Sequence, residues 1–191
     1  MLERVRKFLF HPVKAFSEVK EDTLSDAFKY FMPLLFILAV ILAVLLFAVM
    51  NVTGMSQIIS MLPMPFTVDP AIVVLGGVFL GVLLGGFLLI LYGSVWLHIW
   101  VLIFGGRDKR LKQSFKVVAY GSTPVYVLGW LPGPNILMAP VWTIIAWISG
   151  VMQLHEITSG RAIFIVIVSV IVPLIALGVM ACSLMPLLVK P

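Results

Sequence analysis

The longest apolar run in the chain reads AIVVLGGVFLGVLLGGFLLILYGSVWLHIWVLIFGG, from Ala71 to Gly106, and it contains no charged residue. About 20 apolar residues in a helix already cross the hydrocarbon core of a bilayer. This run is longer, so the helix must tilt, extend beyond the lipid, or break near a glycine such as Gly93. We interpret it as the central spanning helix of a polytopic membrane protein.

Three glycines recur at four-residue spacing along this run: Gly77, Gly81 and Gly85. Residues four apart share one face of a helix, and glycines there leave a groove in which another helix backbone can approach closely. This glycine zipper predicts a helix-packing surface. It can serve packing within one molecule, as a bundle of several helices requires, or form a seam between two molecules.

The composition excludes a water-soluble domain. Of the 191 residues, 62% are hydrophobic and 11% are charged, whereas soluble domains have about 45–50% and about 25%. We therefore predict an all-α polytopic membrane helix bundle in a single domain. The lone Cys182 excludes an intramolecular disulfide and a cysteine-based metal cage. A cleavable signal peptide is not expected, because the first 26 residues have no uninterrupted apolar core.

Residues 1–26 are expected to form a cytoplasmic amphipathic segment. Basic residues alternate there with apolar residues at helical spacing, and such a helix lies in the plane of the lipid headgroups. A solvated linker is the alternative. Thr23-x-x-Asp26 has the pattern of a capping box that opens the first span. The apolar residues in question are Leu2, Val5, Leu9, Val13, Phe16 and Val19.

Residues 27–191 are predicted to form a transmembrane domain with five spans. The expected spans cover about 27–50, 71–106, 114–131, 136–155 and 162–189. An odd number of spans places the two ends of the chain on opposite sides. Twelve of the 13 Lys and Arg residues then fall on the amino-terminal side. The positive-inside rule predicts a multi-pass cell-membrane protein with a cytoplasmic amino end and an external carboxyl end.

The turn after the second span is strongly basic. Cations next to a membrane attract anionic lipid headgroups with about 1 kcal/mol each. We therefore expect contact with anionic lipid there, and the alternative is that these charges fix topology alone. Binding of nucleic acid is not needed to explain the net charge of +5. The lipid-contacting candidates are Arg107, Lys109, Arg110 and Lys112.

The third predicted span is polar at its middle. The residues of this break are Tyr120, Gly121, Ser122, Thr123 and Pro124. Polar and irregular backbone at membrane depth is tolerated where protein covers it or where it lines a cavity. We expect other helices to wrap the break. It is also the one candidate site for a small transporter or channel.

Three ionisable residues, His98, His155 and Glu156, are expected at similar depth near the cytoplasmic side. Two imidazoles and a carboxylate could bind zinc. The spacing does not match a zinc motif, and adjacent residues point in different directions on a helix, so interfacial hydrogen bonding is the preferred interpretation. The sequence has no nucleophile elbow, no phosphate loop and no carboxylate pair within a span. We predict a non-enzymatic protein without a cofactor.

Four motifs in order resemble the Ypt-interacting protein (Yip-domain) family of integral membrane proteins. They are His11-Pro-Val-Lys-Ala-Phe16, Leu97-His-x-x-Val-x-Ile-Phe-Gly-Gly106, Ala119-Tyr-Gly-Ser-Thr-Pro124 and Leu131-Pro-Gly. The resemblance covers nearly the whole chain and implies five transmembrane helices with a cytoplasmic amino end. It carries over no catalytic residues.

The resemblance also implies a range of functions. In eukaryotes the family is associated with vesicle traffic, small GTPases and hetero-oligomers. This chain lacks the Asp-Leu-Tyr-Gly-Pro motif before its first span and resembles the prokaryotic branch, so small-GTPase binding is not carried over. We expect a membrane-organising or trafficking-type scaffold that acts through homo- or hetero-oligomers with other membrane proteins. The alternative is the small transporter or channel described above.

Overall fold

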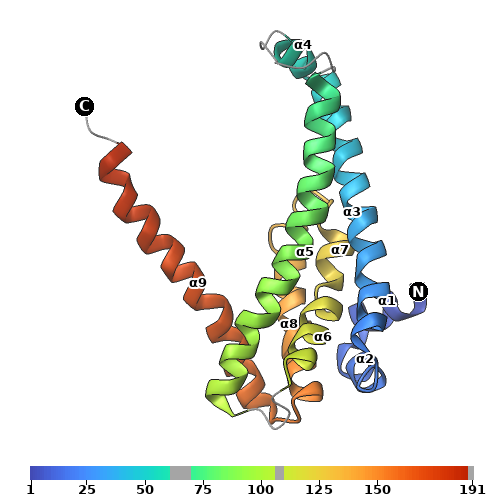
Figure 1. Ribbon diagram of the computed structural model, residues 1–191, viewed down its shortest axis with the longest axis vertical. Coiled ribbons are helices and arrows are strands. Elements are labelled where there is room, and N and C mark those ends of the chain that lie inside the picture. The colour runs from blue at the N-terminus through green and yellow to red at the C-terminus, as the bar shows by residue number, and fades with distance from the viewer. Residues whose placement is uncertain (61–69, 106–109, 189–191) are drawn as a thin grey trace.

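The computed structural model describes residues 1–60, 70–105 and 110–188, and within these ranges it contains helices and no strand. Two long helices, α3 (Leu24–Val52) and α5 (Pro70–Phe104), lie side by side and antiparallel (Figure 1). The short helix α4 (Met55–Ser60) lies at their far end. The all-α prediction is confirmed.

The first span begins as the sequence predicts. Thr23 caps α3 through its hydroxyl, which accepts from the backbone N–H of Asp26 at 3.3 Å. The Asp26 carboxylate accepts in return from the backbone N–H of Thr23 at 2.9 Å. Both halves of the capping box are therefore present, and they satisfy donors that the first turn of a helix leaves free.

Among the residues that the structure describes, three helices are long and apolar enough to cross a membrane: α3, α5 and α9 (Ser159–Leu188). Helix α5 continues through Gly93 without a break. In the third and fourth predicted spans the structure differs from the prediction. The third is divided into α6 (Leu111–Gly121) and α7 (Thr123–Leu128), and the fourth is α8 (Met138–Leu154), a shorter apolar helix.

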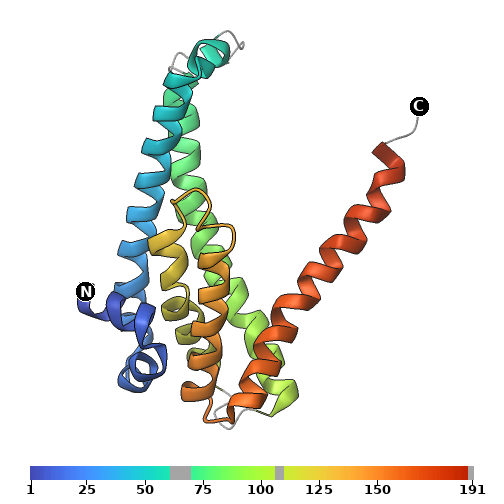
Figure 2. The same cartoon turned by 180° about the vertical axis from the view of Figure 1, so that it is seen from behind.

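Helix α8 has 17 residues, which gives a length of about 25 Å, less than the hydrocarbon thickness of about 30 Å. The connection between α7 and α8 lies at the level of the middle of α3 and α5, not at their far end (Figures 1 and 2). Of the five predicted spans, three are therefore supported by helices of sufficient length and hydropathy, and the count of five is not confirmed. The helices in the third and fourth predicted ranges are shorter than those ranges, because apolar residues such as Trp130 and Ile136 belong to the connection and not to a helix.

The amino-terminal segment forms two short helices, α1 (Leu2–Phe10) and α2 (Pro12–Glu18), which pack against the bundle. Phe8 is 1% exposed and Phe16 is 0% exposed, whereas Leu2 on the predicted lipid face is 85% exposed. The expectation that the apolar face of this segment lies in the headgroups is therefore wrong for Phe16. Phe8 and Phe16 are both buried inside the protein. They contribute to the same core as the spanning helices.

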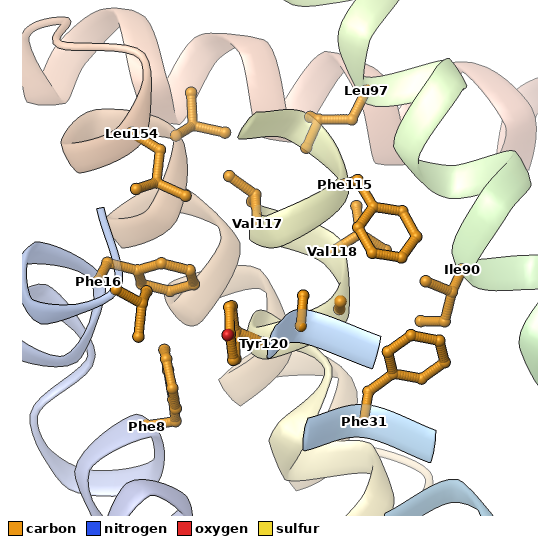
Figure 3. Close-up of a cluster of buried hydrophobic side chains, with 14 of the residues drawn as sticks. Phe8, Phe16, Phe31, Ile90, Leu97, Phe115, Val117, Val118, Tyr120 and Leu154 are labelled. Carbon is orange, nitrogen blue, oxygen red and sulfur yellow. The ribbon is translucent and has the colours of Figure 1, made fainter. Parts of the chain in front are cut away.

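Helix α6 is the centre of that core. Every residue from Gln113 to Gly121 is buried. Side chains from α1, α2, α3, α5 and α8 surround it, as Figure 3 shows for Phe8, Phe31, Leu97 and Leu154. A helix covered on all sides must find partners for its polar side chains inside the protein, and this requirement defines the candidate site.

Helix α9 is attached to the rest of the chain at its base. Its buried residues, Ala162, Ile165, Val166 and Ser169, lie within the first three turns. The Trp96 indole of α5 donates to the Ser169 carbonyl at 2.8 Å. Beyond these turns α9 diverges from α5 and α8 (Figures 1 and 2), and its large apolar side chains from Leu174 to Met180 are exposed.

Candidate functional site

A polar network joins α6 to the amino-terminal helices. Lys116 is 1% exposed, and its ammonium donates to the carbonyls of Val19 at 3.1 Å, Lys20 at 2.7 Å and Asp22 at 3.2 Å. An ammonium has three N–H donors, so each is used. These carbonyls follow the end of α2, where a cation also interacts favourably with the helix dipole. Lys116 therefore caps α2.

The Asp22 carboxylate is the second element of this network. One of its oxygens accepts from the Tyr120 hydroxyl at 2.6 Å and from the Arg4 guanidinium at 3.2 Å. Asp22 thus connects α1 to α6 at the segment between α2 and α3. On the other side of Tyr120, its carbonyl accepts from the Thr123 hydroxyl, which lies 2.8 Å from the Tyr30 hydroxyl. The network therefore reaches α3.

Aromatic packing covers the network. The Phe8 ring is stacked on Tyr120 and meets Phe16 edge-on, with centroids 5.0 Å apart in both pairs (Figure 3). Phe16 also lies against α8 at Gly150, where an added Cβ would come within 2.8 Å of its ring. The backbone of α8 can approach Phe16 this closely because Gly150 has no side chain.

The predicted polar break lies in the same region. Helix α6 ends at Gly121, Ser122 forms the junction, and Pro124 lies in the first turn of α7. All five residues of the break are buried. An added Cβ at Gly121 would come within 2.4 Å of Trp147. The expectation that other helices wrap the break is confirmed.

A second cluster of polar side chains, Ser114, His98 and His155, lies between α5, α6 and α8. The Ser114 hydroxyl is 3.0 Å from His98 Nδ1 and 3.1 Å from His155 Nε2. Ser114 and His155 are both 0% exposed. A hydroxyl donates one proton, so it donates to one imidazole and accepts from the other. The two histidines must therefore present opposite ring nitrogens, one protonated and one free.

The three candidate metal ligands, His98, His155 and Glu156, do not converge on one point. The structure brings His98 and His155 to one hydroxyl, but the Glu156 carboxylate forms an ion pair with Lys20. Within the described ranges there is no group of three or more His, Cys, Asp or Glu residues that could hold a metal ion. A divalent cation between two neutral imidazoles would also lack a compensating negative charge. The hydrogen-bonding interpretation has the better geometric support.

The glycine zipper makes no close packing contact with the described part of the chain. At Gly77, Gly81 and Gly85 an added Cβ would meet no heavy atom within 4 Å. The close approach between α3 and α5 occurs instead at Gly86, where an added Cβ would come within 2.6 Å of Leu35. The sequence favoured packing within one molecule as the role of the zipper, and this is wrong for these three positions. Helix α3 packs on α5 at Gly86 instead.

The basic turn is described in part. Arg107 and Lys109 lie outside the described residues. Arg110 and Lys112 are exposed at the amino end of α6. Lys116, counted by sequence with this basic group, is directed inward and caps α2. Sequence reasoning missed Ser114, Asp22 and Lys116 as network members. For Ser114 and Lys116, burial was indicated by their place beside the apolar residues Phe115 and Val117.

These observations define an integral membrane protein of the α-helical type, with apolar spanning helices around a buried polar core. The model of the Yip1 domain family matches residues 6–180, and the chain therefore belongs to this family of membrane proteins, which is not known for enzymatic activity. The match begins within α1, in agreement with the packing of that helix in the core. Comparisons with curated proteins and with solved structures gave no match.

Proposed function

We propose that this protein is a non-enzymatic scaffold that organises the cell membrane, or acts in membrane traffic, through self-association and contacts with other membrane proteins. In this proposal the amino end is cytoplasmic and the carboxyl end is external. The family supports a membrane role without catalysis. Small-GTPase binding is not part of the proposal, because the chain lacks the eukaryotic motif before its first span.

One observation carries the proposal: the open glycine face of α5. Gly77 and Gly81 are exposed, and no atom of the described residues lies within 4 Å of a Cβ added at either position. Glycines at this spacing allow close contact between helix backbones in lipid. Since α3 packs against α5 at Gly86, the zipper is left available to a helix of another molecule.

The base of the bundle supports a second contact. Arg110 and Lys112 are exposed where α6 begins, near the ends of α5 and α8 (Figure 1). In the proposed orientation these cations face the anionic headgroups of the cytoplasmic leaflet. Lipid contact there would complement the contact between molecules along α5.

The zipper can be tested by the oligomeric state of the protein in lipid nanodiscs or gentle detergent. We expect native mass spectrometry to show an oligomer for the wild type. Gly81→Leu should reduce the oligomeric fraction on the order of ten-fold, because its side chain fills the groove. Gly81→Ala, which adds a single methyl group, should remain largely oligomeric. Equal distributions for the wild type and Gly81→Leu would remove the zipper from the assembly.

The transport alternative has less support, because all five residues of the polar break are buried. Solute flux in proteoliposomes, measured for the wild type and for Pro124→Ala, tests it directly. Flux that depends on Pro124 would overturn the scaffold proposal.

A further inference from the structure

A hollow of about 520 Å³ lies where α5 ends and α9 begins. It is lined by Ile103, Phe104, Gly105, Gly160, Arg161 and Phe164. Beyond the contact between Trp96 and Ser169 the two helices diverge (Figures 1 and 2). The hollow therefore lies at the charged end of two apolar spanning helices, at the level where lipid headgroups are expected.

Missing side chains keep the hollow open. An added Cβ at Gly105 or Gly160 would meet no heavy atom of the described residues within 4 Å. Gly105 has a φ of +80°, a conformation that glycine adopts without strain. Gly160 is helical and needs no such freedom. A glycine at position 160 therefore leaves space beside the guanidinium of its neighbour Arg161.

Arg161 has no carboxylate partner among the described residues, in contrast to three other cations at this end of the molecule. Arg4, Lys7 and Lys20 each form an ion pair with a carboxylate. Within the described part of the chain, Arg161 forms no ion pair or hydrogen bond, and it is exposed to the hollow. A guanidinium presents several N–H donors in a planar arrangement that suits the oxygens of a phosphate.

The remaining walls are apolar. Phe104 and Phe164 meet edge-on with centroids 4.8 Å apart. Ile103 is 59% exposed and Phe164 is 52% exposed, and both lie beside the hollow on the spanning helices. A ligand that fits must combine an anionic group for Arg161 with apolar chains for these surfaces. An inorganic anion would leave the apolar walls uncovered.

We propose that this hollow binds an anionic glycerophospholipid, with its phosphate on Arg161 and its acyl chains against Ile103 and Phe164 between α5 and α9. The proposal rests on the hollow and not on self-association. It adds a defined lipid site to the general attraction expected of the basic turn.

The test is a native mass spectrometry titration of the full chain with phosphatidylglycerol and with phosphatidylcholine. The wild type should retain phosphatidylglycerol preferentially. Arg161→Gln should weaken that retention about five-fold, the effect of one cation near a membrane surface. Gly160→Leu should weaken it at least as much, because the new side chain occupies the hollow. Far-UV circular dichroism verifies that each variant is folded.

Two matched variants control for charge and for added volume. Lys29→Gln removes an exposed cation from the first turns of α3, and Gly178→Leu adds the same side chain to an open position on the same helix as Gly160. Both should bind phosphatidylglycerol as the wild type does. Equal retention by Arg161→Gln, or equal binding of phosphatidylcholine, would overturn the proposal. Full competition by inorganic phosphate would also overturn it, in favour of a soluble anion. Because Gly81 lies outside the hollow, loss of lipid binding and loss of assembly are distinguishable.

Discussion

Phe8 and Tyr120 lie face to face, with ring centroids 5.0 Å apart and ring planes 9° from parallel. One residue belongs to the first helix of the chain and the other to the central helix α6. The Tyr120 hydroxyl also donates to Asp22 at 2.6 Å. The pair thus couples the apolar core to the polar network that holds α1 and α2 in place.

Phe8→Ala should destabilise the protein by about 3–5 kcal/mol, because the truncation leaves a cavity beside Tyr120 and Phe16. Thermal unfolding in detergent, followed by tryptophan fluorescence, measures this loss. Phe10→Ala is the control, since Phe10 is 60% exposed, and its effect should stay below about 1 kcal/mol. Equal destabilisation by the two variants would contradict the burial of Phe8 in the core.

Lys116→Met should release α1 and α2, because three backbone carbonyls after α2 lose their charged donor. The expected cost is on the order of 3 kcal/mol, since hydrogen bonds to charged groups are among the stronger ones in proteins. Limited trypsin cleavage after Arg6 measures the release. Lys112→Met removes an exposed lysine one turn earlier in α6 and should leave the cleavage rate unchanged. A slow cleavage rate in both variants would contradict the capping role.

The contact between α1 and α2 should depend on pH. Lys7 donates to Glu18 at 2.8 Å, and this hydrogen bond lowers the pKa of Glu18 below 4.5 and raises the pKa of Lys7 above 10.5. The Lys7–Glu18 pair therefore stabilises the contact between α1 and α2 at pH values between the ordinary pKa of Glu and that of Lys. This stabilisation is lost as pH falls through the folded-state pKa of Glu18 or rises through that of Lys7.

Hydrogen exchange of α1 in the wild type and in Glu18→Gln measures this dependence. The wild type should be the better protected near pH 7, by a small margin, because the pair is exposed. The two proteins should become equal as Glu18 is protonated at acid pH. Equal protection at all pH values would indicate that the pair contributes nothing.

Ser114→Ala should destabilise the packing of α5, α6 and α8, because His98 Nδ1 and His155 Nε2 both lose a hydrogen bond. The cost of such a loss in a buried site is about 1–3 kcal/mol. Ser183→Ala is the control, because the exposed Ser183 hydroxyl donates within its own helix. A metal chelator should leave the melting temperature of the wild type unchanged. A lower melting temperature with the chelator would instead indicate a metal between the histidines.

The orientation can be measured with single cysteines in a Cys182→Ser background, which removes the one native cysteine. Ser17→Cys in α2 and Gln57→Cys in α4 are exposed positions at opposite ends of the bundle (Figure 1). A membrane-impermeant maleimide should label Gln57→Cys in intact cells and Ser17→Cys after permeabilisation. The reverse pattern would invert the proposed topology.

Local features could be predicted from sequence, and features that join distant segments could not. The capping box at Thr23 was predictable because both partners lie within one turn. The continuity of α5 likewise follows from its own apolar composition. Lys116 is different, since its partner Val19 is 97 residues away and a lysine in a basic region is usually solvated. Lys116 lies between buried neighbours in α6, and its burial is evident only from the packing of other helices around α6.

The amino-terminal helices show the same limit. Helical spacing identifies an apolar face, but it does not say whether lipid or protein covers that face. Phe16 was assigned to the lipid face and is buried in the protein, and Phe8, which is also buried, was not among the apolar positions assigned to that face. The helices in the third and fourth predicted ranges are shorter than those ranges for a related reason: hydropathy counts apolar residues in the connection around Trp130 together with those of the helices.

The contact between Lys116 and the end of α2 has a consequence for the order of events during synthesis. The carbonyl of Val19 emerges from the ribosome 97 residues before the lysine that caps it. At roughly 5–20 residues per second, the delay is roughly 5–20 s. During this interval α1 and α2 exist without Tyr120, Lys116 or α8, and the nearest apolar phase for Phe8 and Phe16 is the membrane surface. We therefore expect the nascent chain to hold α1 and α2 at the lipid surface until α6 is synthesised and provides the protein core for Phe8 and Phe16.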